Sequence, residues 1–214
     1  MNPQRAQTII QQFSQKKIIV LGDLMLDEFI WGEVRRISPE APVPVVDFQR
    51  ESFMPGGAAN VARNLTAMGV KAELFGAVGQ DSAAENLREL LRTQKIGCRG
   101  LVASSSRRTS LKTRIVAQTQ QVVRIDRETR EALAPQLTTR LITTIKAQLR
   151  NTDAVIVGDY GKGVVTQQFL NELKPLCREH GLWLSLDPKP VHQLNLAGLS
   201  LITPNRKEAF ELAG

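Results

Sequence analysis

The sequence predicts an α/β fold in which helices cover both faces of a mostly parallel sheet. Short apolar runs alternate with helical patterns along most of the chain, as in folds built from strand–helix–strand units. The runs are apolar throughout, which indicates strands buried on both faces. Each run ends in Gly, Asp or a turn. In such folds, ligands bind at the carboxyl ends of the strands.

The expected elements follow in order from the N-terminus. The segment MNPQRAQTIIQQFSQ predicts a short amphipathic helix rather than a signal peptide. The run KKIIVLGD predicts the first strand, and four similar runs predict further strands: KAELFGAVG, DAVIVGD, LWLSLD and LSLIT. Helical periodicity between these runs predicts helices over residues 58–68, 83–93, 135–150 and 167–180.

Two segments interrupt this alternation. Residues 29–50 contain three prolines and a stretch of period 2 from Val43 to Phe48. Residues 109–126 predict two short strands around a polar turn at Gln118–Gln121. Both segments are typical of antiparallel strands added to the main sheet. They would form either a small lid over a ligand or an edge hairpin with no role in binding, and composition favours neither.

The composition limits the classes of partner. The chain has 214 residues, of which 42% are hydrophobic, so we expect one globular domain, with two still possible. The net charge of +7 favours an anionic partner. Because the basic residues are dispersed and aromatic residues are few, we expect phosphorylated small molecules, or only a solvated basic surface, rather than nucleic acid.

No stretch is long and apolar enough to predict a membrane span, so we expect no membrane partner. Cys98 and Cys177 lie far apart and in no ligand-spaced pair. This pattern predicts two reduced thiols and a cytoplasmic protein.

The stretch MPGGAANVARNLTAMG places two glycines before an Ala-rich helix. Gly56 and Gly57 would let the backbone approach a ligand closely, and the first N–H groups of the helix would be free to bind an anion or a sugar hydroxyl. Alternatively, the glycines make a turn, and Ala58 and Ala59 let the helix pack tightly on the sheet. The stretch matches neither a Walker A loop nor a dinucleotide fingerprint.

Acidic residues recur where the predicted strands end. A carboxylate accepts several hydroxyl hydrogen bonds and therefore suits a polyol ligand. A single such residue would mean little, since Asp is common in turns, but recurrence at one edge of the sheet favours a site. The residues are Asp23 and Asp27 in VLGDLMLDEF, Asp159 with Lys162 in VGDYGKGV, and Asp187 with Lys189 in LDPKP.

The stretch TPNRKEA has two interpretations. Asn205 would be the N-cap of a helix, and Glu208 would complete a capping box. Alternatively, both residues hold water or a metal beside a phosphate. The local pattern by itself favours the capping box.

Together these stretches resemble the PfkB, or ribokinase-like, family of carbohydrate kinases over nearly the whole chain. GDLMLD is similar to the opening strand of the family, PGGAANVARNLTAMG to its sugar-side glycine signature, and NRKE to its Asn-x-x-Glu element. The segments RISPEAPVPVV, DYGKGV and DPKP are similar to the sequences of a narrower group within the family. Its members phosphorylate D-glycero-β-D-manno-heptose 7-phosphate at O1. This reaction leads to ADP-heptose, the precursor for the lipopolysaccharide core. In many bacteria the kinase is the N-terminal half of a bifunctional protein.

The resemblance implies a ribokinase-like three-layer sandwich with a small antiparallel β lid at about 29–50 and 109–126. It implies a cytoplasmic kinase that uses ATP and Mg²⁺ and forms a homodimer through the lid. The sugar would contact Asp23, Asp27, Gly56, Gly57 and Asn60, and its 7-phosphate would need cations, for which the candidates are Arg36, Lys112 and Arg114. On the nucleotide side it implies Asn205, Glu208 (which would act on Mg²⁺ through water), Lys189, Asp159 and Lys162.

One element of the family pattern is missing. Its general base is the Asp of Gly-Ala-Gly-Asp or a close variant, but neither the glycine pair at 56–57 nor the GKG at 161–163 is followed by Asp. The resemblance places that motif beyond Gly214. We therefore expect a partial domain over residues 1–214, incomplete at the C-terminus and inactive alone. The alternatives are a PfkB kinase for another sugar and a non-catalytic sugar-binding or dimerising remnant.

Overall fold

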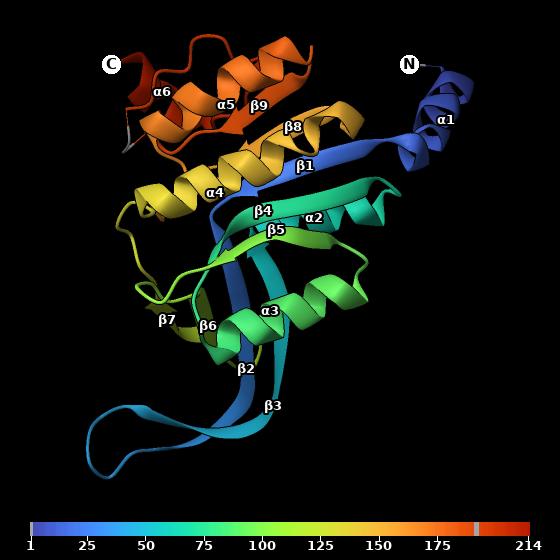
Figure 1. Ribbon diagram of the computed structural model, residues 1–214. Helices are drawn as coiled ribbons and strands as arrows, with labels where there is room; N and C mark the ends of the chain where they lie inside the picture. The colour runs from blue at the N-terminus through green and yellow to red at the C-terminus, as the bar shows by residue number, and fades with distance from the viewer. Residues whose placement is uncertain (1, 191–192) are drawn as a thin grey trace.

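The computed structural model describes residues 2–190 and 193–214. The chain forms two sheets. Figure 1 shows a layered main body, from which a long hairpin over residues 24–57 extends. The six-stranded sheet, here sheet A, has the order β10-β9-β8-β1-β4-β5. The four-stranded sheet, here sheet B, has the order β3-β2-β6-β7.

Every pair of neighbouring strands in sheet A is parallel. Five of its strands coincide with the five apolar runs of the sequence. The sixth, β5, was not predicted, because two glycines interrupt its short apolar run. The strands are β1 (Lys17–Gly22), β4 (Lys71–Val78), β5 (Gly97–Ala103), β8 (Ala154–Gly158), β9 (Trp183–Asp187) and β10 (Leu201–Ile202).

The helices follow the predicted pattern closely. The main difference is at 135–150, where the α-helix ends at Lys146 and a short 3₁₀ turn follows. Among the described residues, no helix is long and apolar enough to cross a membrane. The helical elements are α1 (Pro3–Gln11), η1 (Phe13–Gln15), α2 (Ala58–Ala67), α3 (Ser82–Thr93), α4 (Pro135–Lys146), η2 (Leu149–Asn151), α5 (Gln167–Glu179) and α6 (Arg206–Ala213).

Two hydrophobic cores lie on opposite faces of sheet A. Ile19 and Leu21 of β1 belong to the core that contains α4 and α5, whereas Val20 belongs to the core that contains α2 and α3. This alternation is the period-2 geometry of a strand, and it requires apolar side chains on both faces. The predicted three-layer sandwich is therefore confirmed.

Sheet B contains the two segments that interrupt the alternation, and it differs from the prediction in two ways. They form a separate sheet rather than additions to the main sheet, and β2 pairs with β6 in parallel. The pairs β2–β3 and β6–β7 are antiparallel, as expected. The polar turn is confirmed at Gln118 and Thr119, which both have left-handed backbones. The strands are β2 (Leu24–Ile37), β3 (Pro44–Gly57), β6 (Ser110–Ala117) and β7 (Gln120–Arg127).

The carboxyl ends of the central strands meet at one rim of sheet A. Gly22 of β1 pairs with Gly158 of β8, which in turn pairs with Asp187 of β9. Asp23 and Asp159 directly follow their strands, so three acidic residues lie along this rim, as the sequence indicates. Sheet B begins at the same place, because β2 starts one residue after Asp23.

Candidate functional site

Asp23 lies beneath the rim and is 0% exposed. Its carboxylate accepts hydrogen bonds from the backbone N–H groups of Tyr160 at 2.8 Å, Lys162 at 2.9 Å and Val164 at 3.1 Å. A carboxylate in this setting organises the loop after β8. The expectation that Asp23 contacts the sugar is therefore wrong for this conformation, because the side chain has no surface to offer a ligand.

Asp27 lies at the root of sheet B and is partly open to solvent. Its Oδ1 atom contacts Nη1 of Arg114 at 2.6 Å, with 21% of the Asp27 side chain and 22% of the Arg114 side chain exposed. Arg114 also lies over the ring of Phe29, 5.1 Å from its centre. Two interactions thus fix the guanidinium, and the guanidinium orients the carboxylate. Asp27 keeps surface on which it can accept hydroxyl hydrogen bonds.

The two glycines bring the backbone close to both carboxylate residues. A Cβ atom at Gly56 would clash with the Asp27 carboxylate, and one at Gly57 would clash with the carbonyl oxygen of Asp23. Gly57 also has a φ of 57°, which favours glycine, and it is the N-cap of α2. The turn and the buried Ala58 and Ala59 support the structural interpretation of this stretch. They also place Asn60, in the first turn of α2, just beyond Gly57.

Lys112 and Lys162 do not lie free at the rim. Lys112 of β6 contacts Asp126 at 2.9 Å and Glu128 at 3.6 Å, and Lys162 contacts Glu128 at 2.7 Å. Arg130 contacts the other carboxylate oxygen of Glu128 at 2.7 Å. Burial raises the pKa of Glu128. The contacts with Lys162 and Arg130 and the charge of Lys112 lower the pKa by more than burial raises it, so it lies below the ordinary value.

Arg36 does not join this site. It is exposed near the far end of β2, nine strand positions beyond Asp27, or about 30 Å along the strand. The structure brings Lys112 and Arg114 close to Asp27, since Lys112 is its direct neighbour on β6. A single phosphate near Asp27 can therefore not contact Arg36 of the same chain.

The residues expected on the nucleotide side lie at the next strands of the rim. Asp159 is buried, and it accepts hydrogen bonds from the backbone N–H groups of Gly161 at 2.9 Å and Lys189 at 3.3 Å. The side chain of Lys189 contacts Glu208 at 3.2 Å. Burial raises the pKa of Asp187, and the negative charge of Glu208 raises it as well. A hydrogen bond from Thr203 lowers the pKa but does not cancel these two effects.

The capping box at the start of α6 is confirmed. The side chain of Asn205 accepts from the N–H of Glu208 at 3.0 Å, and Oε2 of Glu208 accepts from the N–H of Asn205 at 2.9 Å. Because Oε1 contacts Lys189, both oxygens of Glu208 already have partners. Across the described residues, no three His, Cys, Asp or Glu side chains converge to hold a metal ion. An action of Glu208 on Mg²⁺ through water stays a prediction.

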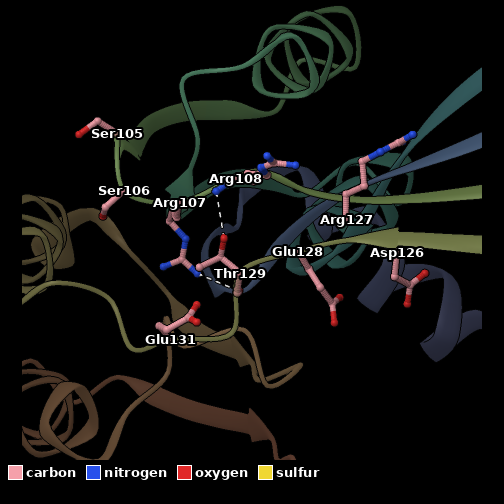
Figure 2. A pocket seen from close by; sticks show the side chains of 9 residues that line it. All are labelled: Ser105, Ser106, Arg107, Arg108, Asp126, Arg127, Glu128, Thr129 and Glu131. Carbon is pink, nitrogen blue, oxygen red and sulfur yellow. Dashed lines mark hydrogen bonds between the residues drawn. The ribbon is translucent and has the colours of Figure 1, made fainter.

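Sequence reasoning missed two residues of this region. Arg107 donates hydrogen bonds to the backbone carbonyls of Lys162 and Thr129, and it thereby ties the loop before β6 to the loop after β8. Glu128 joins Lys112 to Lys162, and no motif signals this role. Both residues line a hollow of about 680 Å³, and Figure 2 shows the side chains that surround it. Its lining consists of Ser105, Ser106, Arg107, Arg108, Asp126, Arg127, Glu128, Thr129 and Glu131.

Solved structures share this architecture. A carbohydrate kinase from Agrobacterium tumefaciens superimposes with a TM-score of 0.70 at 20% identity, over 93% of this chain and 64% of that one. A ribokinase from Arabidopsis thaliana, solved with ribose and ATP, gives 0.65 at 14% identity, over 92% of this chain and 62% of that one. At these identities the likeness shows the fold, and the ribokinase-like prediction is confirmed.

Curated relatives share much more sequence. The bifunctional protein HldE of Citrifermentans bemidjiense is 40% identical over 214 residues, which are 100% of this chain and 44% of that protein. HldE of Helicobacter pylori is 42% identical over 193 residues, which are 90% of this chain and 42% of that protein. The chain thus spans less than half the length of these relatives. The family model of the pfkB carbohydrate kinases matches residues 15–214. The chain belongs to the pfkB family of carbohydrate kinases.

Proposed function

We propose that this chain binds the sugar for an ATP-dependent phosphorylation of D-glycero-β-D-manno-heptose 7-phosphate at O1, which yields the 1,7-bisphosphate. Membership of the pfkB family supports a carbohydrate kinase, and the similarity to HldE proteins supports heptose chemistry. The observation that carries the proposal is the partly exposed carboxylate of Asp27, held by Arg114 beside Gly56 where the lid meets the rim.

The geometry suits recognition of a polyol. Asp27 accepts hydroxyl hydrogen bonds on its exposed side, while Arg114 and the absence of a side chain at Gly56 fix its orientation. Asn60 adds an amide at the start of α2. Phosphoryl transfer depends mainly on positioning and charge neutralisation, so a rigid acceptor site contributes directly to the rate.

The proposal places ATP at the neighbouring strands of the rim, near Asp159, Lys189, Asn205 and Glu208. When bound, Mg²⁺ would neutralise phosphate charge, and it commonly uses one or two carboxylates together with the substrate phosphates. The protein side chains here contribute a cation, Lys189, and a helix start whose cap is intact. The two free thiols, Cys98 and Cys177, support a cytoplasmic location.

We also propose that sheet B forms the contact between two copies of this chain. Ile30, Ile115 and Val123 lie side by side on three neighbouring strands of sheet B. Val123 and Ile125 on β7 are exposed, so an apolar stripe faces outward. Such a stripe is a common feature of association surfaces.

The binding proposal is tested by calorimetric titration of the 214-residue chain with the heptose 7-phosphate, fructose 6-phosphate and ribose. We expect the heptose phosphate to bind most tightly. Asp27→Asn should weaken that binding about 10-fold or more, since a hydrogen bond to a charged group contributes about 1.5–3 kcal/mol. Asp47→Asn, which changes an exposed carboxylate on β3, is the matched control and should bind normally.

Other outcomes point to the alternatives. Tightest binding of ribose or fructose 6-phosphate would indicate a pfkB kinase for another sugar. Because no Gly-x-Gly-Asp occurs in the chain, we expect binding without appreciable turnover in an ADP-release assay. Turnover comparable to that of family members with the motif would contradict this expectation. Binding of no sugar, together with a stable dimer, would favour a dimerising role.

A further inference from the structure

Two lysines from different parts of the fold contact one carboxylate oxygen. Nζ of Lys162 lies 2.7 Å from Oε2 of Glu128, and Nζ of Lys112 lies 3.6 Å from the same atom. Lys162 belongs to the loop after β8, Lys112 to β6, and Glu128 follows β7. The Glu128 side chain is only 8% exposed, so these charges meet where sheet B joins the rim of sheet A.

Oε2 of Glu128 is held mainly by the charges of the two lysines. This atom is buried and has no hydrogen-bond partner of good geometry, although an ammonium group lies within 2.7 Å. Each ammonium carries three donors, and one oxygen of Glu128, together with Asp126 at 2.9 Å from Lys112, accepts only part of them. The two lysines therefore form a cationic pair that a larger anion with more acceptor oxygens would fit better than Glu128 does.

This cationic pair lies next to the proposed sugar site. Lys112 is the direct neighbour of Asp27 across the β2–β6 pair. The backbone of Lys162 is fixed from two sides, because its N–H donates to Asp23 and its carbonyl accepts from Arg107. Lys162 is thereby held at a defined position of the rim, where its ammonium group and that of Lys112 both contact Glu128.

Glu128 lines a hollow into which its side chain can move, and Arg130 is a second ionic partner for its carboxylate. It lines the hollow of about 680 Å³, and Figure 2 shows its carboxylate directed to the same side as that of Asp126, whereas Arg127 points to the other side. Its Oε1 atom contacts Arg130 at 2.7 Å, and the Arg130 side chain is 73% exposed. Glu128 can thus leave the two lysines and keep an ion pair at the surface.

We infer that Lys112 and Lys162 bind the phosphate that the sugar substrate carries, and that Glu128 occupies this phosphate site when no ligand is bound. The inference rests on the proposed function for the identity of the sugar, but the anion site itself does not depend on it. A phosphate monoester carries up to two negative charges and three strong acceptor oxygens, so it replaces Glu128 at the two ammonium groups. Glu128 then remains with Arg130.

The inference revises three earlier expectations. Lys162 moves from the nucleotide side to the phosphate of the sugar. Arg114 is left to orient Asp27, and Arg36 lies too far along β2 to take part. Lys112 keeps the role that the sequence suggested for it, now with a defined partner.

The test measures binding of inorganic phosphate and of the heptose 7-phosphate to the whole chain by calorimetry, at low ionic strength and at a temperature where circular dichroism shows each variant folded. Lys112→Gln and Lys162→Gln should each weaken both ligands about 10-fold, and Lys162→Arg should restore most of the loss. Glu128→Gln should instead tighten both about 10-fold, because a competing negative charge is removed. Glu33→Gln, the same change in an exposed ion pair of β2, should alter neither.

The sign of the Glu128→Gln effect decides the question. Weaker phosphate binding in this variant would mean that Glu128 positions the lysines rather than competing with the ligand, and it would overturn the inference. Unchanged binding in both lysine variants would overturn it as well. Failure of the proposed function would give a different result. The lysine and Glu128 variants would still change the affinity for inorganic phosphate. The heptose phosphate would bind no more tightly than inorganic phosphate, and Asp27→Asn would not change its affinity.

Discussion

Sheet A and sheet B are stabilised in different ways. In sheet A, Ile19 and Val20 of the central strand are 0% exposed on opposite faces, and helices cover both sides. In sheet B, every residue of β7 is exposed. The root of sheet B reaches the core, where Leu24 and Leu26 of β2 are buried with α2 and α3. Ion pairs at Glu128 also join β6 to the loop after β8. Burial of apolar surface therefore stabilises the main body and the root of sheet B, whereas the exposed strand β7 depends on strand pairing and ion pairs.

The two carboxylates of GDLMLD show the same contrast over four residues. Asp23 faces sheet A and binds three backbone N–H groups, whereas Asp27 belongs to sheet B and faces one arginine and solvent. The first carboxylate is part of the scaffold, and the second is available to a ligand. Similar residues at neighbouring positions thus have different roles because they lie on different sides of the junction.

The largest effect is expected at Asp23. Asp23→Ala removes the buried acceptor of three backbone N–H groups, which should lower the free energy of unfolding by about 3–5 kcal/mol. Urea denaturation followed by circular dichroism measures this loss. Asp27→Ala is the matched control and should lose about 1 kcal/mol, because its ion pair is partly exposed. Equal losses at the two positions would show that the comparison is wrong.

An intermediate effect is expected at the junction itself. Glu128→Gln leaves Lys162 without its counter-charge and Lys112 with Asp126 alone, and it should cost about 1–3 kcal/mol of unfolding free energy in ligand-free protein. Denaturation with and without phosphate measures it, and added phosphate should recover part of the loss. A variant that is as stable as the parent chain would mean that this cluster does not hold sheet B in place.

The same variant should change the dependence of stability on pH. The pKa of folded Glu128 lies below its ordinary value, since Lys162, Arg130 and Lys112 face it. Its contribution is therefore complete above about pH 4.5 and is lost as the pH falls through the folded pKa. The difference in stability between parent and variant should shrink over that range. A difference that stays constant down to pH 3 would exclude this assignment.

The smallest effect on folding is expected on the open face of sheet B. Val123→Asp should change the unfolding free energy by only about 0.5 kcal/mol or less, because the side chain is exposed. If sheet B joins two copies, the variant should nevertheless lower the mass measured by light scattering from dimer to monomer. Ile10→Asp on the exposed face of α1 is the control and should leave the mass unchanged. A parent chain that is already monomeric would remove the dimer proposal.

Local sequence determined most of the architecture. Uninterrupted apolar runs, helical periodicity and the Asn205–Glu208 spacing act over a few residues, so they predicted five strands of sheet A, the helices and the capping box. The strand β5 was not predicted, because Gly97 and Gly100 interrupt its apolar run. The recurrence of Asp at strand ends also predicted that these carboxylates share one rim, since parallel strands bring their carboxyl ends to one edge.

Tertiary structure alone decided which of these residues a ligand can contact. The burial of Asp23, the distance of Arg36 from Asp27, and the meeting of Lys112 with Lys162 at Glu128 join segments up to 141 residues apart. No local pattern encodes them, because an electrostatic contact depends on distance in space and on the exclusion of water, and only the folded chain sets these. The sequence by itself determined the fold and brought its acidic strand ends to one edge, and packing decided which of its charged residues are buried.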